Sequence, residues 1–403
     1  MLLKIAWRNI WRHKTRSTVI IVSVLFGIWS GLFIQAVMNG MVEERIKTAI
    51  EKEISHIQLH HPEFKKDYDV EFVINNGVQI LNETKRSKNV KAASGRSLAK
   101  GMLATATGSA GINIIGVNSS DEDSATNLSK NIIEGTFLSE HLKHEMVIGE
   151  KLHKKLKLKL NSKVVITLTD KDKNITSGAF RIKGIYKTKN STYDEANVFV
   201  NINELNSLLN TPNSVHEIAI LLNTNETLDT VYNSLKSKYP DIKTETWQEV
   251  SPETNLLLST TNQSMLIFMS IIMLALAFGI INTMLMAVLE RTREIGMLIA
   301  LGMNKARVFK MILIETVLLV LTGTPFGILL GFITTQYFGI HGIRLSGAQE
   351  LYSSFGMSET IFLKLNISDY LVVIELVIIT SLISSIFPAR KALSLNPSDA
   401  IRK

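Results

Sequence analysis

The stretch TVIIVSVLFGIWSGLFIQAV, residues 18–37, decides the fold of this chain of 403 residues. It contains no charged residue, and its length matches the roughly 20 residues that a helix needs to cross a bilayer. Basic residues precede the stretch, whereas Glu43 and Glu44 follow it. Because Lys and Arg favour the cytoplasmic side of a membrane, we expect a spanning helix over residues 17–40 with a cytoplasmic N-terminus.

Three more apolar windows predict further spans, at 263–289, 308–338 and 369–388. Four crossings return the C-terminus to the side of the N-terminus. The connection 290–307 and the tail 389–403 carry Lys and Arg, as the N-terminal segment does, so all three are expected in the cytoplasm. Residues 41–262 and the loop 339–368 are then expected outside it. The pattern predicts an α-helical membrane protein with one span, a large inserted domain and three more spans.

The average composition hides this division. The chain is 46% hydrophobic, its mean hydropathy is +0.17 and its net charge is +8. The basic residues crowd the edges of the apolar windows, which indicates that they set topology and favours no nucleic-acid partner. The sequence contains no cysteine, which excludes a disulfide framework, a cysteine-ligated zinc site and thiol chemistry.

The first 16 residues, MLLKIAWRNIWRHKTR, predict an amphipathic helix in the cytoplasmic interface of the membrane. Leu3, Ala6, Trp7 and Ile10 share one helical face. Basic residues recur every four positions on another face, at Lys4, Arg8, Arg12 and Arg16. A basic arm that binds nucleic acid is the rival interpretation, and the direct continuation into a span disfavours it.

Small residues recur within two of the spans. Gly323, Gly327 and Gly331 repeat every four residues around Pro325, and Gly27 and Gly31 form a shorter pair. Such spacing lets helix backbones approach closely, and a proline can kink a helix. The partner helix could belong to the same chain or to a second subunit, and both readings stay open.

Glu315 and Glu375 are ionisable residues within predicted spans. Burying a carboxylate there costs free energy unless the group is paired, protonated or in contact with water. A proton or ion relay is the functional interpretation. For Glu315 we favour an acid at the membrane interface, because Lys310 lies one helical turn earlier and Arg307 is near. Glu375 is left without a role.

The inserted region reads as a mixed α+β domain. Alternating or β-branched runs predict strands near 54–60, 164–168, 180–186, 197–202 and 217–222. Helices are expected over 71–88, from a cap at Asn203 to Leu209, and over 226–238.

Candidate sites in this domain are weak. His56, His60 and His61 have no nearby carboxylate or cysteine to complete a metal site. Asp170, Asp172 and Asn174 begin like a calcium loop, but its essential glycine and final glutamate are missing. The sequence has no P-loop motif and no G-x-S-x-G motif, so we expect no enzyme activity, no metal and no cofactor in this chain.

The segment ERTREIGMLIALGMNKARVFKMILIET, residues 290–316, interleaves charged and apolar residues. This predicts a short amphipathic helix, ended by a glycine, that can dock on a partner. The candidate residues of this helix are Glu290, Arg291, Arg293, Glu294, Ile295, Gly296, Leu298, Leu301 and Gly302.

At this segment the chain resembles a known family. ERTREIGMLIALGM (290–303) and PARKALSLNPSDAIR (388–402) resemble signatures of the MacB/FtsX superfamily of ABC transporter permeases, the mechanotransmission class. VIGEKLHKKLKLKLNSKV (147–164) is similar to a stretch within the family's outer domain. The order of one span, a large domain and three spans is also the family's, so the resemblance covers nearly the whole chain.

The resemblance implies a machine of several subunits in a bacterial inner membrane. Two permease subunits, identical or related, would contact membrane lipids and bind two ABC ATPase subunits, which hold the ATP and magnesium. Residues 290–303 would be the coupling helix seated on the ATPase. The periplasmic domain would contain an inserted subdomain at about 95–200.

The resemblance leaves several functions open. The junction AVMNGM (36–41), the length and the lack of a fused ATPase resemble the lipoprotein-releasing permeases LolC and LolE, which favours a lipoprotein substrate and a periplasmic carrier. MacB-like export of drugs, peptides or toxins is the next alternative. FtsX-like signalling to an outer partner, without transport, is the third.

Overall fold

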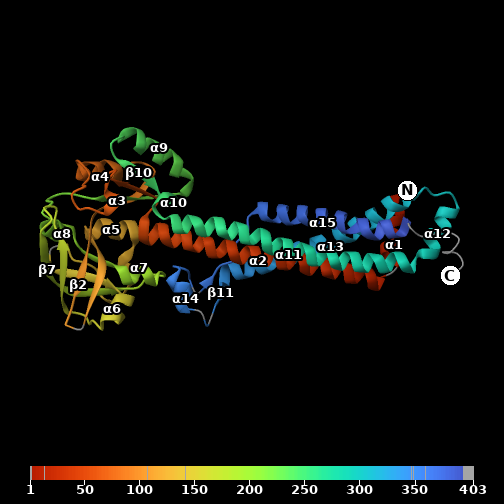
Figure 1. The fold of residues 1–403 in the computed structure, drawn as a ribbon, viewed down its shortest axis with the longest axis horizontal. Coiled ribbons are helices and arrows are strands. Elements are labelled where there is room, and N and C mark those ends of the chain that lie inside the picture. Colours follow the sequence, from red (N-terminus) through yellow and green to blue (C-terminus); the bar gives the residue numbers. More distant parts are fainter. Residues whose placement is uncertain are drawn as a thin grey trace. The chain divides into compact units, whose positions relative to one another are not determined.

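The computed structural model describes residues 2–12, 14–106, 108–140, 142–345, 347, 349–358 and 360–393 (Figure 1). They fold into two units. The helical unit contains the residues up to Val42, Ser259–Arg344 and the residues from Thr360 onward. The α+β unit contains Glu43–Leu258 and Leu345–Glu359, apart from the positions outside the described ranges.

Among the described residues, four helices are long and apolar enough to cross a membrane. They are α2 (Lys14–Thr48), α11 (Pro252–Glu290), α13 (Lys305–His341) and α15 (Ile367–Leu393). The helical unit also contains α1 (Leu2–Arg12), α12 (Thr292–Ala300), β11 (Ile343–Arg344) and β12 (Thr360–Ile361). The expected class, four membrane helices around a large α+β insertion, is therefore observed.

The helices extend beyond the apolar windows. Helix α2 continues to Thr48, where the predicted span ends at residue 40, because Ile46 and the following Ile50 pack into the apolar core of the α+β unit. Helix α15 continues through Pro388 to Leu393, so the proline does not end it. The remaining residues of the predicted tail, 394–403, lie outside the described residues.

Helix α1 covers most of the predicted amphipathic segment, and part of its apolar face is buried. Ala6 and Ile10 are fully buried, and Ile10 belongs to the core of the helical unit. Trp7 and Trp11 are about half exposed and meet edge to face, so Trp7 does not share the buried face. The side chains of Leu3, Lys4 and Arg16 lie outside the described residues.

The α+β unit is built on a ten-stranded sheet with the order β10-β1-β9-β2-β3-β8-β5-β7-β4, in which β6 pairs with both β2 and β7. The strands are β1 (Ile57–His60), β2 (Val90–Ala104), β3 (Ser109–Val117), β4 (Ile132–Gly135), β5 (Glu145–Gly149), β6 (Lys163–Thr169), β7 (Ile175–Tyr186), β8 (Asn197–Asn201), β9 (Glu217–Leu222) and β10 (Lys243–Thr246). The helices are α3 (Phe64–Asp67), α4 (Gly77–Lys85), α5 (Ser119–Thr126), α6 (Glu150–Leu156), α7 (Ser191–Ala196), α8 (Ile202–Leu209), α9 (Leu228–Lys238), α10 (Trp247–Val250) and α14 (Gln349–Ser354), with a π-helix at Ala49–Ile54 and 3-10 turns at Leu128–Asn131 and Asn225–Thr227.

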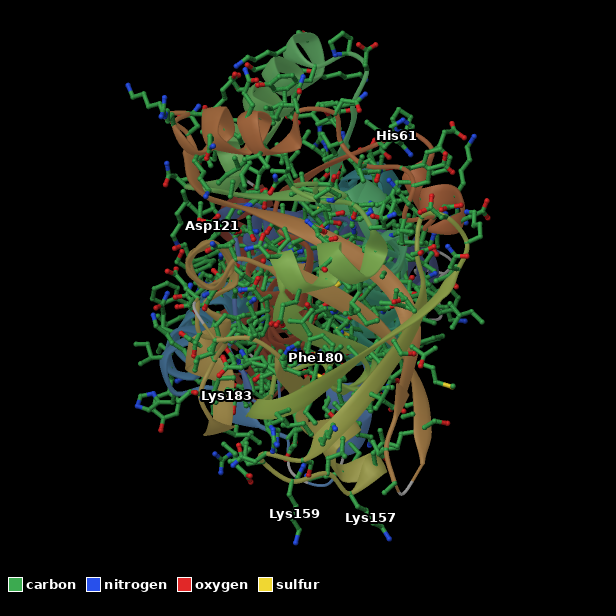
Figure 2. All side chains as sticks on the ribbon, turned by 90° about the vertical axis from the view of Figure 1, so that its left-hand side faces the viewer. His61, Asp121, Lys157, Lys159, Phe180 and Lys183 are labelled. Atoms are coloured by element: carbon green, nitrogen blue, oxygen red, sulfur yellow. The ribbon has the colours of Figure 1, made fainter. Side chains whose placement is uncertain are left out.

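Pairing closes part of this sheet into a ring of strands in the order β2-β3-β8-β5-β7-β6 and back to β2. Alternate side chains of a strand point to opposite faces, so the ring encloses its own core, which includes Leu103, Val164 and Phe180. Figure 2 shows Lys157 and Lys159 projecting away from these strands, beside the buried Leu156 and Leu158.

The ring uses strands between Arg96 and Asn201, which is the stretch where the sequence predicts an inserted subdomain at about 95–200. The N-terminal half of β2 pairs instead with β9 in an open sheet with its own core. The long strand β2 thus belongs to two cores, with Ala93 in one and Ala99 in the other.

Three local predictions in this unit were inaccurate at their boundaries. The helix expected over 71–88 is α4, Gly77–Lys85, because Ile74 donates its N–H to Val215 O and Asn76 adopts a left-handed conformation. Asn201, not Asn203, caps α8: its side chain accepts the N–H of Asn203 at 2.9 Å. The helix expected from 226 begins at Leu228 after a 3-10 turn.

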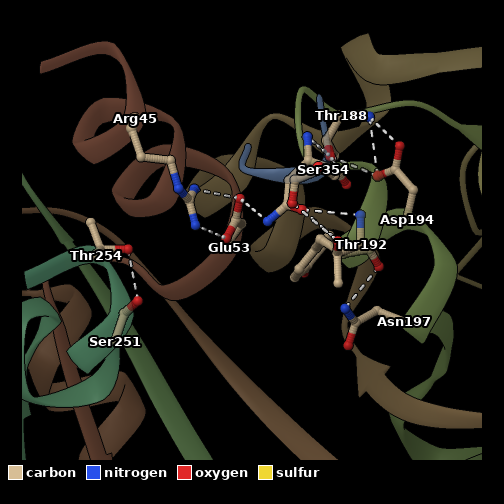
Figure 3. Close-up of polar contacts among 11 residues, drawn as sticks. Arg45, Glu53, Thr188, Thr192, Asp194, Asn197, Ser251, Thr254 and Ser354 are labelled. Carbon is tan, nitrogen blue, oxygen red and sulfur yellow. Dashed lines mark hydrogen bonds and ion pairs between the residues drawn. The ribbon is translucent and has the colours of Figure 1, made fainter. Parts of the chain in front are cut away.

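A polar cluster joins three segments of the α+β unit (Figure 3). Arg45 pairs with Glu53 at 2.9 Å, and Glu53 also accepts a hydrogen bond from Asn190 Nδ2 at 3.1 Å. Thr192, in α7, donates to the carbonyl of Ser354 at 3.1 Å. The end of α2 and the α7 segment are therefore linked through buried or half-buried polar groups, and an exposed hydrogen bond links α7 to α14.

Asp194 is the most perturbed carboxyl of this cluster. Its side chain is buried and accepts the N–H of Thr188 at 2.9 Å and the Thr188 hydroxyl at 2.6 Å (Figure 3). Burial outweighs these hydrogen bonds and raises the pKa of Asp194 to about 7. The folded protein therefore binds a proton that the unfolded chain has already lost above pH 4 or so.

We predict that Asp194 lowers stability as pH rises from about 4 to 7, since its folded pKa is raised above its unfolded value. Relative to Asp194→Asn, the unfolding free energy of the wild-type chain should fall by on the order of 3 kcal/mol across that window. Thermal unfolding of both proteins in nanodiscs at several pH values measures this. A difference between the two proteins that does not change with pH would contradict the raised pKa.

Candidate functional site

The connection between α11 and α13 is the segment predicted to dock on the ATPase, and the structure gives it a defined shape. Helix α11 ends at Glu290, Arg291 leaves the helical conformation, and α12 follows at once from Thr292. Helix α12 ends at Ala300, and Gly302, with φ of +91°, turns the chain away from the helix direction. Asn304 then caps α13 by accepting the N–H of Ala306 at 3.0 Å. The separate short helix within the predicted 290–307 segment is thus Thr292–Ala300, and α13 already begins at Lys305.

A buried ion pair anchors this connection. Arg291 Nη1 donates to Glu315 Oε1 of α13 at 2.9 Å, and both side chains are almost completely buried. The sequence pattern sets Glu315 beside Lys310 and Arg307, but the structure pairs it with Arg291. A single buried charge is strongly destabilising, so each residue requires the other. The pair ties the junction of α11 and α12 to α13.

The two faces of α12 differ. Ile295 and Gly296 are buried, and Ile295 belongs to the core of the helical unit. Arg293, Met297 and Leu301 are exposed, and Leu301 is 85% exposed. Positions separated by four residues share a helical face, so a basic side chain and two apolar side chains form one surface. We call Arg293, Met297 and Leu301 the α12 outer face.

A cavity of about 100 Å³ lies under α12. Ile295, Leu298 and Met311 contribute apolar walls, and Arg291 and Glu315 line it as well. Glu294, which also lines it, pairs with Arg12 of α1 at 3.1 Å. That pair is exposed and contributes little stability, so α12 is held mainly by Ile295 and by the buried ion pair.

The structure separates the predicted residues of this segment by role. Arg291, Ile295 and Gly296 face inward, Glu294 and Leu298 are half-buried, and Glu290, Arg293, Leu301 and Gly302 are exposed. Met297, which the predicted set omits, belongs to the outer face. Its position four residues after Arg293 is the signal that identifies it.

The glycines of α13 lie against α2 of the same chain. A Cβ atom at Gly323 would lie 2.9 Å from Ile21 O, and one at Gly327 would lie 2.8 Å from Ile28 Cβ. At Gly331 it would lie 2.7 Å from the Leu32 side chain. Larger residues at these positions would push the two helices apart, so this stripe serves packing within the chain.

The glycines of α2 face a different helix. A Cβ at Gly27 would lie 3.3 Å from Leu276, and one at Gly31 would lie 3.3 Å from the sulfur of Met269, both on α11. Helix α2 therefore meets α11 through one edge and α13 through another. Glu375 is exposed on α15, and its surroundings assign it no role.

A polar cluster that the sequence pattern did not single out connects α2 with the start of α15. Asp369 accepts hydrogen bonds from Gln35 at 2.9 Å, from Asn39 at 3.0 Å and from the N–H of Asn366 at 2.8 Å. Gln35 and Asn39 are polar residues one helical turn apart in an otherwise apolar run, and that spacing is the signal for such a contact.

Parts of the chain are similar to known transporter subunits. A family model described as the FtsX-like permease C-terminal domain matches residues 266–397. The chain is 26% identical over 278 residues to an uncharacterized ABC transporter permease of Methanocaldococcus jannaschii, an alignment that covers 67% of this chain and 65% of that protein. It is 31% identical over 150 residues to the macrolide export ATP-binding/permease protein MacB of Hahella chejuensis, covering 36% of this chain and 20% of MacB.

Among solved structures, the periplasmic region of MacB from Actinobacillus actinomycetemcomitans aligns with 53% of this chain and 97% of that structure, at 12% identity and a TM-score of 0.37. The sequence alignments with the two relatives cover less than two thirds of the M. jannaschii permease and a fifth of the H. chejuensis MacB.

The buried ion pair predicts an asymmetry between single and double substitutions. Glu315→Leu alone should lower the unfolding free energy by about 3–5 kcal/mol, since it leaves the Arg291 charge buried. Arg291→Met combined with Glu315→Leu should recover most of that loss. Unfolding of the three proteins in detergent measures it, and a double variant no more stable than the single one would refute the pairing.

The glycine stripe predicts that Gly327→Val destabilises the helical unit by about 1–3 kcal/mol, because the added side chain meets Ile28. Gly279→Val is the matched control: a Cβ at Gly279 of α11 has no atom within 4 Å. Thermal unfolding in nanodiscs compares them. Equal effects of the two substitutions would mean that α13 does not pack on α2 through its glycines.

Proposed function

We propose that this member of the MacB/FtsX superfamily of ABC transporter permeases is a non-catalytic subunit that couples a separate ABC ATPase to work on the far side of a membrane. The family match, the ABC permease relatives and the four membrane helices support the permease assignment. The ATPase partner, ATP with magnesium in that partner, and a second permease subunit are expectations from the family.

The α12 outer face carries the proposal. Arg293, Met297 and Leu301 present one charged and two apolar groups on a helix held from behind by Ile295 and the Arg291–Glu315 pair. An interface of this kind needs an apolar centre and a rigid support. A partner that pushes on α12 would act directly on α11 and α13, because the ion pair ties their junction together.

The proposed orientation follows the distribution of basic residues. Basic residues occur before the first apolar stretch, in the connection between α11 and α13 and at the end of α15; they include Arg8, Arg12, Arg293 and Arg390. Glu43 and Glu44 follow the first apolar stretch, at the end away from Arg8 and Arg12. We infer that both termini and α12 face the cytoplasm of a bacterial inner membrane and that the α+β unit is periplasmic.

The substrate is best proposed from the relatives. Export of a drug, peptide or toxin in the manner of MacB is favoured over lipoprotein release, since a relative described above is named for macrolide export. Two other functions remain, lipoprotein release with a periplasmic carrier and signalling without transport. Purification of the complex and identification of the proteins recovered with it distinguish them. Acylated lipoproteins recovered with the complex would favour release, and a soluble wall protein alone would favour signalling.

The docking proposal predicts that Leu301→Asp weakens the complex with the ATPase by more than about tenfold, because a charge replaces an exposed apolar contact at the centre of the interface. The measurement is the concentration of purified permease, in nanodiscs, that half-maximally stimulates ATP hydrolysis by the partner.

Ile340→Asp serves as the matched control, since Ile340 is a comparably exposed apolar residue at the opposite end of α13. It should leave the stimulation unchanged. Full stimulation by Leu301→Asp, in a protein with normal thermal stability, would exclude α12 as the docking helix.

A further inference from the structure

The largest cavity described in the α+β unit has no place in the proposed coupling. Its volume is about 400 Å³, within the range of small-molecule sites. It lies beside β2 near Arg96 and Leu98, where that strand passes from the core of the open sheet to the core of the ring. Ligand sites often form where two cores meet.

Strand pairing builds the floor of this cavity. Arg96, Leu98 and Lys100 alternate along β2, so their side chains share one face of the sheet. On the neighbouring strand β3, Ile115 lies opposite Leu98 and Asn113 lies opposite Lys100. The floor therefore has an apolar centre with a polar group on each side.

The charged side chains at one end of the cavity already have partners. Arg96 is buried and binds Glu122 at 2.7 Å and Glu217 at 3.0 Å. Glu53 is held by Arg45. Lys65, at the rim, binds Glu245 at 2.7 Å. Arg96 is shared by two carboxylates and the other two pairs are balanced, so this set offers no net positive charge to an anion.

Lys100 differs from the other cations that line the cavity. Its ammonium lies 3.9 Å from the ring centre of Tyr68, and no described carboxylate forms an ion pair with it. A cation on an aromatic face keeps its other side available for an anion.

We propose that this cavity binds a small amphiphilic anion, with its acidic group at Lys100 and its apolar body over Leu98 and Ile115. The site requires neither the ATPase nor the coupling helix, so this inference is independent of the proposed function. An amphiphilic cation is disfavoured, because Glu53 and Glu217 each already form an ion pair with an arginine. Lys100 is the group that would select the charge of the ligand.

The absence of cysteine from the sequence makes a direct test possible. Leu98→Cys places one thiol on the cavity floor of the full chain in nanodiscs, where neutral methyl methanethiosulfonate can modify it. Octanoate is the anionic probe, and octyltrimethylammonium is a cationic probe with the same alkyl chain. At about ten times its dissociation constant, octanoate should slow modification about tenfold, since the bound form is protected.

Adding Lys100→Met should remove the protection by octanoate, whereas adding Lys163→Met, an exposed lysine of β6 that does not line the cavity, should preserve it. Val250→Cys provides a second reporter on another wall and should give the same result. No protection at either reporter, equal protection by the cationic probe, or protection that survives Lys100→Met would overturn the proposal.

Discussion

The ion pair between Arg291 and Glu315 is the contact on which the rest of the account depends. Arg291, where α11 ends and α12 begins, and Glu315 of α13 are both buried, and loss of one charge would weaken the stabilisation of the other. The pair fixes α12 to α13, although the helical conformation is interrupted at Arg291 before α12 and at Gly302 after it. An apolar surface at Met297 and Leu301 can therefore be presented on a rigid support instead of a loose loop.

Packing in the rest of the helical unit relies on shape, since apolar helices gain no hydrophobic energy from leaving a lipid environment. The glycines of α13 admit α2 at close range, and Gly27 and Gly31 admit side chains of α11. The hydrogen bonds that Asp369 accepts from Gln35 and Asn39 add specific polar contacts between α2 and the start of α15. Closely packed helices change between discrete arrangements, which suits a unit that would pass a movement of α12 along its length.

The fold class follows from the sequence because apolar windows and flanking charges are local properties. The helix ends do not, because they depend on residues distant in sequence. Ile46 and Ile50, at the end of α2, pack into a core that includes Ile220, and the segment before α4 is held by the hydrogen bond from Ile74 N to Val215 O. In the candidate site, amphipathic spacing identifies α12. The partner of Glu315 is 24 residues away, and helical periodicity alone pointed to Lys310 instead. The cavity beside β2 depends on the pairing of β2 with β3 and β9, which no local pattern shows.

The most direct test of the central claim is a contact map of α12 in the native membrane. A photoreactive amino acid at position 301 should cross-link this chain to an ABC ATPase in intact cells, and the same probe at position 340 should not. An adduct with an ATPase at 301 alone is the predicted result. An ATPase cross-linked equally at both positions, or at neither while the two proteins still purify together, would show that the ATPase docks elsewhere and that α12 is not the coupling helix.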